Sequence, residues 1–255
     1  MEPTARSLAR TYSDRVYPDP WEKVEDYQRV LAYAAEHPDA GRTAVGTALD
    51  LPSARVRGWL NGGKPDPVRG INTASRHRWI EPEDNMASAL VELLAHILAG
   101  GSIDETFVPA ISTGRRVDRT MGMNVFEAVG VGARTRHADS DRRATEVYPT
   151  SDASVLGRCL VTMGAPQGKK NNLDAIPSTV WDSPEPLRRR FVECYVRHRG
   201  THFKSKATTR IQEERPTSYM TDLYELINES VSSHVSHGVQ GITISADAAR
   251  ELGLD

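Results

Sequence analysis

Long apolar runs and cysteine are scarce in this 255-residue chain, and each scarcity excludes a class of protein. No stretch reaches the roughly 20 apolar residues that a membrane-spanning helix needs, and the N-terminus has no apolar signal-peptide core. The two cysteines, Cys159 and Cys194, lack the spacing of a zinc-binding pair. We therefore expect a cytoplasmic protein with reduced thiols, no membrane association, no bound metal and no other cofactor.

An excess of charge of either sign is also missing, because 32 basic and 34 acidic residues give a net charge of -2. This total excludes a strongly basic nucleic-acid-binding protein, although it does not describe local charge. Lysine occurs at only 23, 64, 169, 170, 204 and 206, so arginine supplies most of the positive charge. Arginine suits bidentate contacts with phosphate and guanine, but codon bias explains the same imbalance. The length is sufficient for two domains, each with a hydrophobic core.

The first 80 residues are predicted to form a helical domain, residues 21–80, that follows a loose arm over residues 1–20. In the arm Ser, Pro, Asp and Arg follow no periodicity. From Trp21 apolar side chains recur at helical spacing, and this helix ends near His37. A short helix then turns Val45 and Leu49 inward and carries the small Gly46 where two helices cross closely.

A tight turn at residues 50–52 leads into a second short helix, for which Ser53 is the expected N-cap and Val56, Trp59 and Leu60 the inner face. This stretch resembles the helix-turn-helix of site-specific recombinases and many repressors at apolar positions 45, 49, 51, 56 and 59. Asp50 stands where that family often has glycine. The resemblance implies that the second helix enters the major groove of DNA. The DNA-binding residues would be Ser53, Ala54, Arg55 and Arg57 at the groove, Asn61 and Lys64 nearer the backbone, and Arg69 in the same basic segment.

Local charge agrees with this interpretation. Between Arg42 and Ile80 the chain has seven basic and two acidic side chains, a net charge of +5 in a slightly acidic protein. Such a basic segment is expected where phosphates are neutralised. The alternative is a helical hairpin that packs on the next domain and leaves its arginines in solvent. Residues 64–71 lead into a further short helix that ends near residues 79–80, and residues 81–85 are the expected linker.

From residue 86 the same order of elements can be read twice along the chain. The first pass, residues 86–168, has a helix at 86–100, strands at 102–104 and 106–112, a helix at 124–129, a hairpin at 133–149 and a helix from 152. The second pass, residues 183–255, has a helix at 184–199, strands at 201–203 and 207–213, a helix at 219–231, a hairpin at 234–245 and a helix at 247–252. Ser183 is the expected N-cap of its first helix and Pro184 the first helical residue. Residues 169–182 link the two passes.

The first helix of each pass ends in small residues, as LLAHILAGGSI (93–103) and VECYVRHRG (192–200). With its α-β-β-α-β-β-α order, residues 86–255 resemble the LAGLIDADG homing endonucleases, whose common helix form LLGLILGDGSI is close to the first of these segments. The resemblance implies an α+β fold in which an N-terminal helix-turn-helix domain precedes two four-stranded sheets that form a saddle over DNA. The two helices would pair closely through Ala95, Ala99, Cys194 and Gly200.

The carboxylates that this family uses to hold divalent metal ions are missing. They stand immediately before each closing glycine, where this chain has Gly100 and Arg199. Asp104 and Glu105 follow the helix end, on the wrong side for a simple replacement. The resemblance therefore implies a catalytically dead relative that acts as a DNA-binding regulator. Two alternatives remain: a Mg²⁺-dependent endonuclease with displaced metal ligands, and a second domain that binds protein partners while only the first domain touches DNA.

Basic side chains on the predicted strands extend the candidate DNA surface. Strand alternation places Arg134 with Arg136, and Lys204 with Lys206, on common strand faces, and Arg210 belongs to the same predicted set. These side chains would contact phosphates of double-stranded DNA, and the alternative is a solvated strand face. Because one chain supplies both helices of the pair, we expect a monomer.

Overall fold

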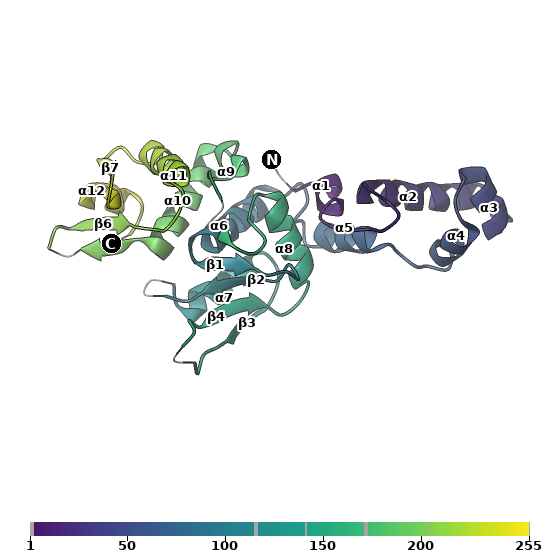
Figure 1. Cartoon of the computed structure of the whole chain (residues 1–255), viewed down its shortest axis with the longest axis horizontal. Helices are drawn as coiled ribbons and strands as arrows, with labels where there is room; N and C mark the ends of the chain where they lie inside the picture. The colour runs from purple at the N-terminus through teal and green to yellow at the C-terminus, as the bar shows by residue number, and fades with distance from the viewer. Residues whose placement is uncertain (1–2, 115–116, 141, 171–172, 204, 255) are drawn as a thin grey trace. The chain divides into compact units, whose positions relative to one another are not determined.

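A computed structural model describes residues 3–114, 117–140, 142–170, 173–203 and 205–254. The chain divides into two compact units: residues 4–76 form a helical unit, and residues 77–255 with residues 1–3 form a mixed unit of helices and sheets (Figure 1). The α+β class is therefore confirmed. Within the described ranges, every helix is too short or too polar to cross a membrane.

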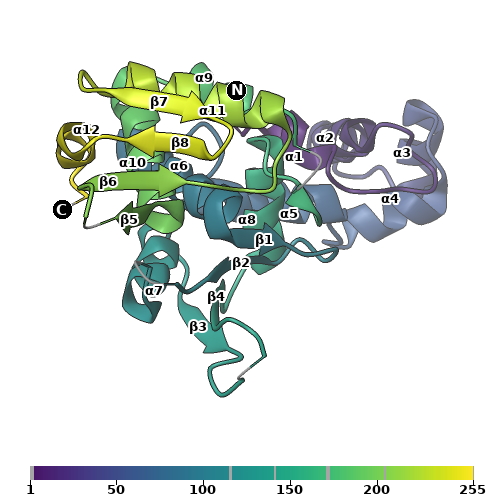
Figure 2. The same cartoon turned by 60° about the vertical axis from the view of Figure 1, so that its left-hand side comes forward.

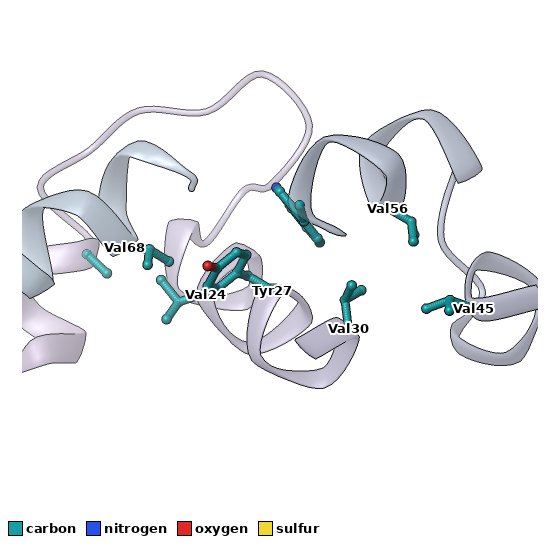
Figure 3. Close-up of a cluster of buried hydrophobic side chains, with 8 residues drawn as sticks. Val24, Tyr27, Val30, Val45, Val56 and Val68 are labelled. Atoms are coloured by element: carbon teal, nitrogen blue, oxygen red, sulfur yellow. The ribbon is translucent and has the colours of Figure 1, made fainter. Parts of the chain in front are cut away.

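The helical unit is held together by one apolar cluster. Its helices are α1 (Ala5–Ala9), α2 (Pro20–Glu36), α3 (Arg42–Leu49), α4 (Ser53–Leu60) and α5 (Asp66–Arg76). Val24, Tyr27 and Val30 recur every three residues on α2, so one face of that helix is apolar. This face meets Val45 of α3, Val56 and Trp59 of α4, and Val68 of α5 (Figure 3).

The N-terminal segment differs from the loose arm that the sequence predicts. Residues 5–9 form α1, which begins with a capping box in which the Thr4 and Ser7 side chains each accept a hydrogen bond from the other's backbone. Leu8 and Ala9 are fully buried. An ion pair of 2.6 Å between Arg10 and Asp19 holds the connection to α2. A helix of five residues is too short to show apolar periodicity, which explains why the sequence pattern missed it.

The turn between α3 and α4 is compact. Asp50 adopts the left-handed conformation with φ of 55°, and the Leu51 amide donates to the Gly46 carbonyl at 2.8 Å. The glycine that the helix-turn-helix family often has at the position of Asp50 adopts this backbone conformation without strain. The N-cap of α4 is Pro52, and no side chain caps the helix with a hydrogen bond. Ser53 is the first residue of the helix itself, so the prediction of Ser53 as N-cap was wrong.

The mixed unit contains the same series of elements twice. The first series is α6 (Asp84–Gly100), β1 (Gly101–Ile103), β2 (Pro109–Ser112), α7 (Arg119–Ala128), β3 (Ala133–Arg136), β4 (Glu146–Pro149) and α8 (Ala153–Thr162). The second is α10 (Glu185–Arg199), β5 (Thr201–Phe203), β6 (Thr208–Ile211), α11 (Thr217–Glu229), β7 (Val235–Gly238), β8 (Gly241–Ile244) and α12 (Ala246–Glu251). The sheets have corresponding strand orders, β1-β2-β4-β3 and β5-β6-β8-β7, and all neighbouring strands are antiparallel (Figure 2).

Helices α6 and α10 pack against each other at the centre of this unit. Small residues allow close approach: Ala95, Ala99 and Cys194 are buried, and a Cβ atom on Gly100 would lie 1.8 Å from Nε2 of His198. Pro184 is the N-cap of α10, so the prediction that Ser183 caps this helix and Pro184 begins it is off by one residue. A short helix, α9 (Ser178–Trp181), lies in the segment predicted as a plain linker.

Two glycines of the α3–α4 segment should respond to alanine with opposite signs. A Cβ atom on Gly46 would lie 2.7 Å from the Leu51 carbonyl oxygen, whereas one on Gly58 would meet nothing within 4 Å. We expect Gly46→Ala to lower the free energy of unfolding by about 1–3 kcal/mol. Gly58→Ala should raise it by up to ~1 kcal/mol, because alanine is the better helix former. Urea denaturation followed by circular dichroism measures both, and equal effects of the two variants would contradict this account of the turn.

Candidate nucleic-acid interface

The outer face of α4 is open to solvent. Val56 and Trp59 point into the apolar cluster of the helical unit. Ser53, Arg57 and Asn61 follow each other at intervals of four residues along the opposite face, and all three are exposed. Among the predicted DNA-binding residues, Ala54 and Lys64 are exposed as well. The burial of one face of α4 thus produces a continuous polar surface on the other.

Arg55 does not belong to this free surface. Its guanidinium lies 4.8 Å from the centre of the Tyr17 ring, and Nη1 donates to the Tyr17 hydroxyl at 2.7 Å. That hydroxyl in turn donates to Oδ2 of Asp26 at 2.8 Å. Burial, together with the bond to Asp26, raises the pKa of Tyr17 to about 12. Arg55 therefore ties α4 to the segment before α2, and its role in this structure is to hold the unit together.

Arg69 also lies apart from the outer face of α4. It is exposed on α5, where it forms an ion pair with Asp66 one turn earlier. Exposed pairs of this kind contribute little to stability and exchange readily with other partners. Arg69 is therefore available to an anion, but on a different helix from Arg57.

In the mixed unit, two arginines share the outward face of the first sheet. Arg134 and Arg136 of β3 both stack over the Tyr148 ring of β4, at 4.9 and 5.1 Å from its centre. The opposite face of this sheet is buried: the side chains of Val147 on β4 and Ile111 on β2 are both fully buried. Arg136 donates to Glu146 at 2.6 Å, so Arg134 is the more available of the two charges.

The second sheet has a similar arginine–aromatic pair. The Arg210 guanidinium on β6 lies 5.3 Å from the Phe203 ring of β5 and donates to Gln240 at 3.0 Å. Lys206 is exposed in the turn between β5 and β6, so its predicted place on a strand face was wrong. Lys206 also lies between the two predicted strands, 201–203 and 207–213, so strand alternation does not apply to it. Lys204 lies outside the described residues.

A pocket of about 890 Å³ lies where α6 and α10 end. Its lining comes from the end of α6 and the start of β1 (residues 99–102), the end of β2 and the residues after it (112–114), Lys170, the end of α10 (198–199) and residues 212–215. Gly100 and Arg199, the positions at which the LAGLIDADG resemblance would require carboxylates, both line it. The charge of this pocket therefore depends on the other side chains that line it.

Two cations occupy the end of α6. Lys170 Nζ donates to the carbonyl oxygens of Ile97 and Leu98 at 3.1 and 3.4 Å. Arg215 donates to the Leu98 carbonyl at 2.7 Å and to the Lys170 carbonyl at 2.8 Å. The Leu98 carbonyl belongs to the last turn, which the helix leaves without backbone donors, whereas the Ile97 carbonyl also accepts from the Gly101 amide. Both cations lie at the negative end of the helix dipole. Burial, reinforced by the Arg215 charge, lowers the pKa of Lys170 to about 8.

Of the two carboxylates that line the pocket, Glu213 is engaged and Glu214 is exposed. Glu213, with a side chain 3% exposed, pairs with Arg199 at 3.2 Å and Arg215 at 3.3 Å, and accepts a hydrogen bond from Tyr195 at 2.8 Å. Oδ1 of Asp104 accepts hydrogen bonds from Thr106 and the Val108 amide. Burial opposes ionisation of Asp104, but these hydrogen bonds outweigh it and its pKa is lowered. The lining thus has three basic side chains against the two carboxylates of Glu213 and Glu214, a small surplus of positive charge that favours an anion over a divalent metal ion.

Potential metal ligands gather elsewhere in the mixed unit. Glu92, His96 and Cys194 form a cluster at the α6–α10 interface, and it is the only such group of three or more found among the described residues. The sequence pattern does not reveal this cluster, since Cys194 follows His96 by almost a hundred positions. A helical spacing of four between Glu92 and His96 is visible in the sequence, but this spacing alone is common on helix faces.

Comparisons with known proteins do not assign the chain to a family. No model of a known protein family matches it, and neither does any curated protein. A functional proposal therefore depends on the exposed face of α4, the sheet arginines and the cationic pocket described above.

Lys170 makes stability depend on pH in a defined direction. Its pKa is lowered from 10.5 to about 8 in the folded chain. Between these values the unfolded chain binds more protons, so the Lys170 contribution to the free energy of unfolding rises with pH. We expect the stability of the native chain relative to Lys170→Met to increase above pH 8, by at most ~1.4 kcal/mol per pH unit.

Denaturation curves at several pH values measure this difference, and Lys169→Met, at the exposed neighbouring position, is the matched control. Buried Cys159 and Cys194 have pKa values raised to about 12 and titrate with the opposite sign. They are common to all three proteins, so their effect cancels in the comparison. A difference between the native chain and Lys170→Met that does not change with pH would contradict the assigned environment of Lys170.

Proposed function

We propose that this chain is a sequence-specific DNA-binding protein that acts as a transcriptional regulator and does not cut DNA. The observation that carries the proposal is the outer face of α4. Ser53, Arg57 and Asn61 form an exposed row there, and in the described part of the chain their side chains have no hydrogen-bond or ion-pair partner. A helix whose inner face is fully packed and whose outer polar row is unengaged is suited to bind a ligand along that row.

DNA is the ligand that best fits the chemistry of this row. An arginine flanked by serine and asparagine provides donors for guanine and phosphate and both donors and acceptors for adenine. The charge of +5 over residues 42–80 favours a polyanion. Arg57 is assigned the base contact because Arg55 is held by Tyr17. Lys64 and Arg69, both exposed, would add phosphate contacts.

In this proposal the mixed unit makes a second set of contacts, with the phosphate backbone of the DNA. Two sheets of corresponding strand order beside one central helix pair are the arrangement expected from the LAGLIDADG resemblance. Arg134 and Arg210 stand on the outward faces of the two sheets, one on each. Such contacts with phosphates would add affinity without sequence information. A surface for protein partners is the alternative use of this unit.

Cleavage is the weaker alternative because the pocket at the helix ends is cationic. Lys170, Arg199 and Arg215 surround the place where a nuclease of this type would bind Mg²⁺. A bound hard cation requires several oxygen ligands. The buried carboxylate of Glu213 is already neutralised by two guanidinium groups, and the lining has one further carboxylate, the exposed Glu214. A phosphate group is the more compatible occupant.

The first test is selection of a binding site from random duplex DNA, followed by affinity measurements by fluorescence anisotropy. Arg57→Ala should weaken binding to the selected site by about 1–3 kcal/mol, or roughly 5-fold to 150-fold, because one base contact is lost. Arg29→Ala is the matched control, since Arg29 is an exposed arginine of α2 in the same unit, where it pairs with Asp26. It should bind as the native chain does. Failure to enrich any sequence at low salt, or equal affinities of the two variants, would reject the proposal.

The second test concerns cleavage of the selected site. We expect a supercoiled plasmid with this site to stay intact when incubated with the chain and Mg²⁺. Conversion to the nicked or linear form that requires Mg²⁺, and that is lost in Glu213→Gln, would establish the nuclease alternative instead. A gel that resolves the three plasmid forms gives the answer, and the anisotropy measurement shows that the variant still binds DNA.

A further inference from the structure

A carboxylate, an imidazole and a thiol meet inside the α6–α10 pair. Glu92 and His96 lie one turn apart on α6, and Cys194 faces them from α10. One potential ligand atom from each lies within 4.8 Å of the others. His96 is 1% exposed and Cys194 3% exposed, whereas Glu92 is half-buried. Polar atoms that are buried in this way are stable only when their hydrogen atoms and lone pairs have partners.

His96 and His198 share one hydrogen across the α6–α10 interface. Burial lowers the pKa of His96 to about 4 and that of His198 to about 3, so both rings are neutral at pH 7. Their Nδ1 atoms are 3.1 Å apart, and one of the two must carry the shared hydrogen. In the tautomer in which His96 donates from Nδ1, its Nε2 keeps a lone pair that can bind a cation.

In this tautomer Nε2 of His96 faces a second acceptor, Oε1 of the half-buried Glu92, at 4.0 Å. Two acceptors that face each other away from bulk water repel unless a proton or a cation lies between them. The Cys194 thiol can donate its hydrogen, but only to one of the two, and thiols are weak donors. A cation bound by all three groups would satisfy both acceptors at once.

We propose that Glu92, His96 and Cys194 bind a divalent metal ion of intermediate softness, with Zn²⁺ as the best match. The mixed set of oxygen, nitrogen and sulfur donors is typical of Zn²⁺ and unsuited to Mg²⁺ or Ca²⁺. Tetrahedral Zn²⁺ holds such donors about 3.3–3.8 Å apart, so the side chains close by ~1 Å on binding. The metal–sulfur bond forms as the S–H bond breaks, and the thiol proton passes to solvent.

Groups around the cluster already orient two of the ligands. Arg190 donates to Oε2 of Glu92 at 2.7 Å, which leaves Oε1 free to face the metal. The hydrogen bond between Nδ1 of His198 and Nδ1 of His96 orients the His96 ring. The Arg190 charge weakens cation binding, but the carboxylate and thiolate together supply two negative charges. A surface pocket of about 490 Å³ between Glu92 and α7 reaches the cluster at Glu92, the side from which a water molecule would enter as fourth ligand.

The test uses the full-length, tag-free chain and Co²⁺ as a spectroscopic substitute for Zn²⁺. Titration with Co²⁺ should produce a thiolate-to-cobalt charge-transfer absorption in the near ultraviolet, which Zn²⁺ then displaces. Cys159→Ser is the matched control, because Cys159 is a buried thiol of α8 outside the cluster. It should keep the absorption, and Cys194→Ser should lose it. Zn²⁺ should also raise the melting temperature of the native chain and of Cys159→Ser.

Absence of the absorption from both the native chain and Cys159→Ser would overturn the proposal. So would an undiminished absorption in folded Cys194→Ser, which would assign the thiolate to Cys159. Glu92→Gln offers a second variant, since Glu92 is half-buried and glutamine preserves its size. It should lower the Co²⁺ affinity by at least about tenfold, and an unchanged affinity would remove Glu92 from the site. All these measurements are made without DNA, so they do not depend on the proposed function.

Discussion

The mixed unit depends on the close packing of α6 against α10. Leu90, Leu94 and Leu98 on one face of α6 are fully buried, and Val91, Ala95 and His96 on its other faces are buried as well. The helix is thus covered on several sides and cannot be stable without its neighbours. At the end of the pair, Gly100 leaves room for the His198 ring. The first strand of each sheet begins directly after one of these helices, at Gly101 and Thr201. The geometry of one helix pair therefore sets where both sheets begin.

The same packing determines what the helix ends can bind. Two helices that end together expose carbonyl groups and the negative ends of their dipoles, and this local charge attracts cations. In a nuclease, metal ions held by carboxylates can compensate this negative potential. In this chain Lys170 and Arg215 compensate it directly, through hydrogen bonds to carbonyl groups in the last turn of α6. The absence of carboxylates at positions 100 and 199 and the presence of these cations are thus two parts of one arrangement, on which the proposal of a protein that does not cut DNA depends.

Local pattern was enough to predict the order of elements, but not the contacts that define the sites. The helix at 184–199 and the strand at 201–203 agree with α10 and β5 to within a residue, since helical periodicity and a closing glycine mark them in the sequence. Helix α1 is too short to leave such a pattern. The pairing of Arg55 with Tyr17 spans 38 positions, that of His96 with His198 spans 102, and no sequence periodicity connects such partners. Periodicity therefore located the helices, whereas the partner of each polar side chain could be identified only from the three-dimensional structure.

Arg55 and Arg57 show how little separates a structural side chain from one available to a ligand. Two positions on a helix are about 200° apart around its axis, so the two arginines leave α4 in nearly opposite directions. Arg55 turns toward the segment before α2 and is satisfied by the ring and hydroxyl of Tyr17. Arg57 turns to solvent beside Ser53 and Asn61. An arginine already satisfied within the protein must give up those contacts before it can bind a base, which subtracts from any affinity it adds. Arg57 has no such contacts to lose, and sequence discrimination by α4 is therefore expected to depend on it.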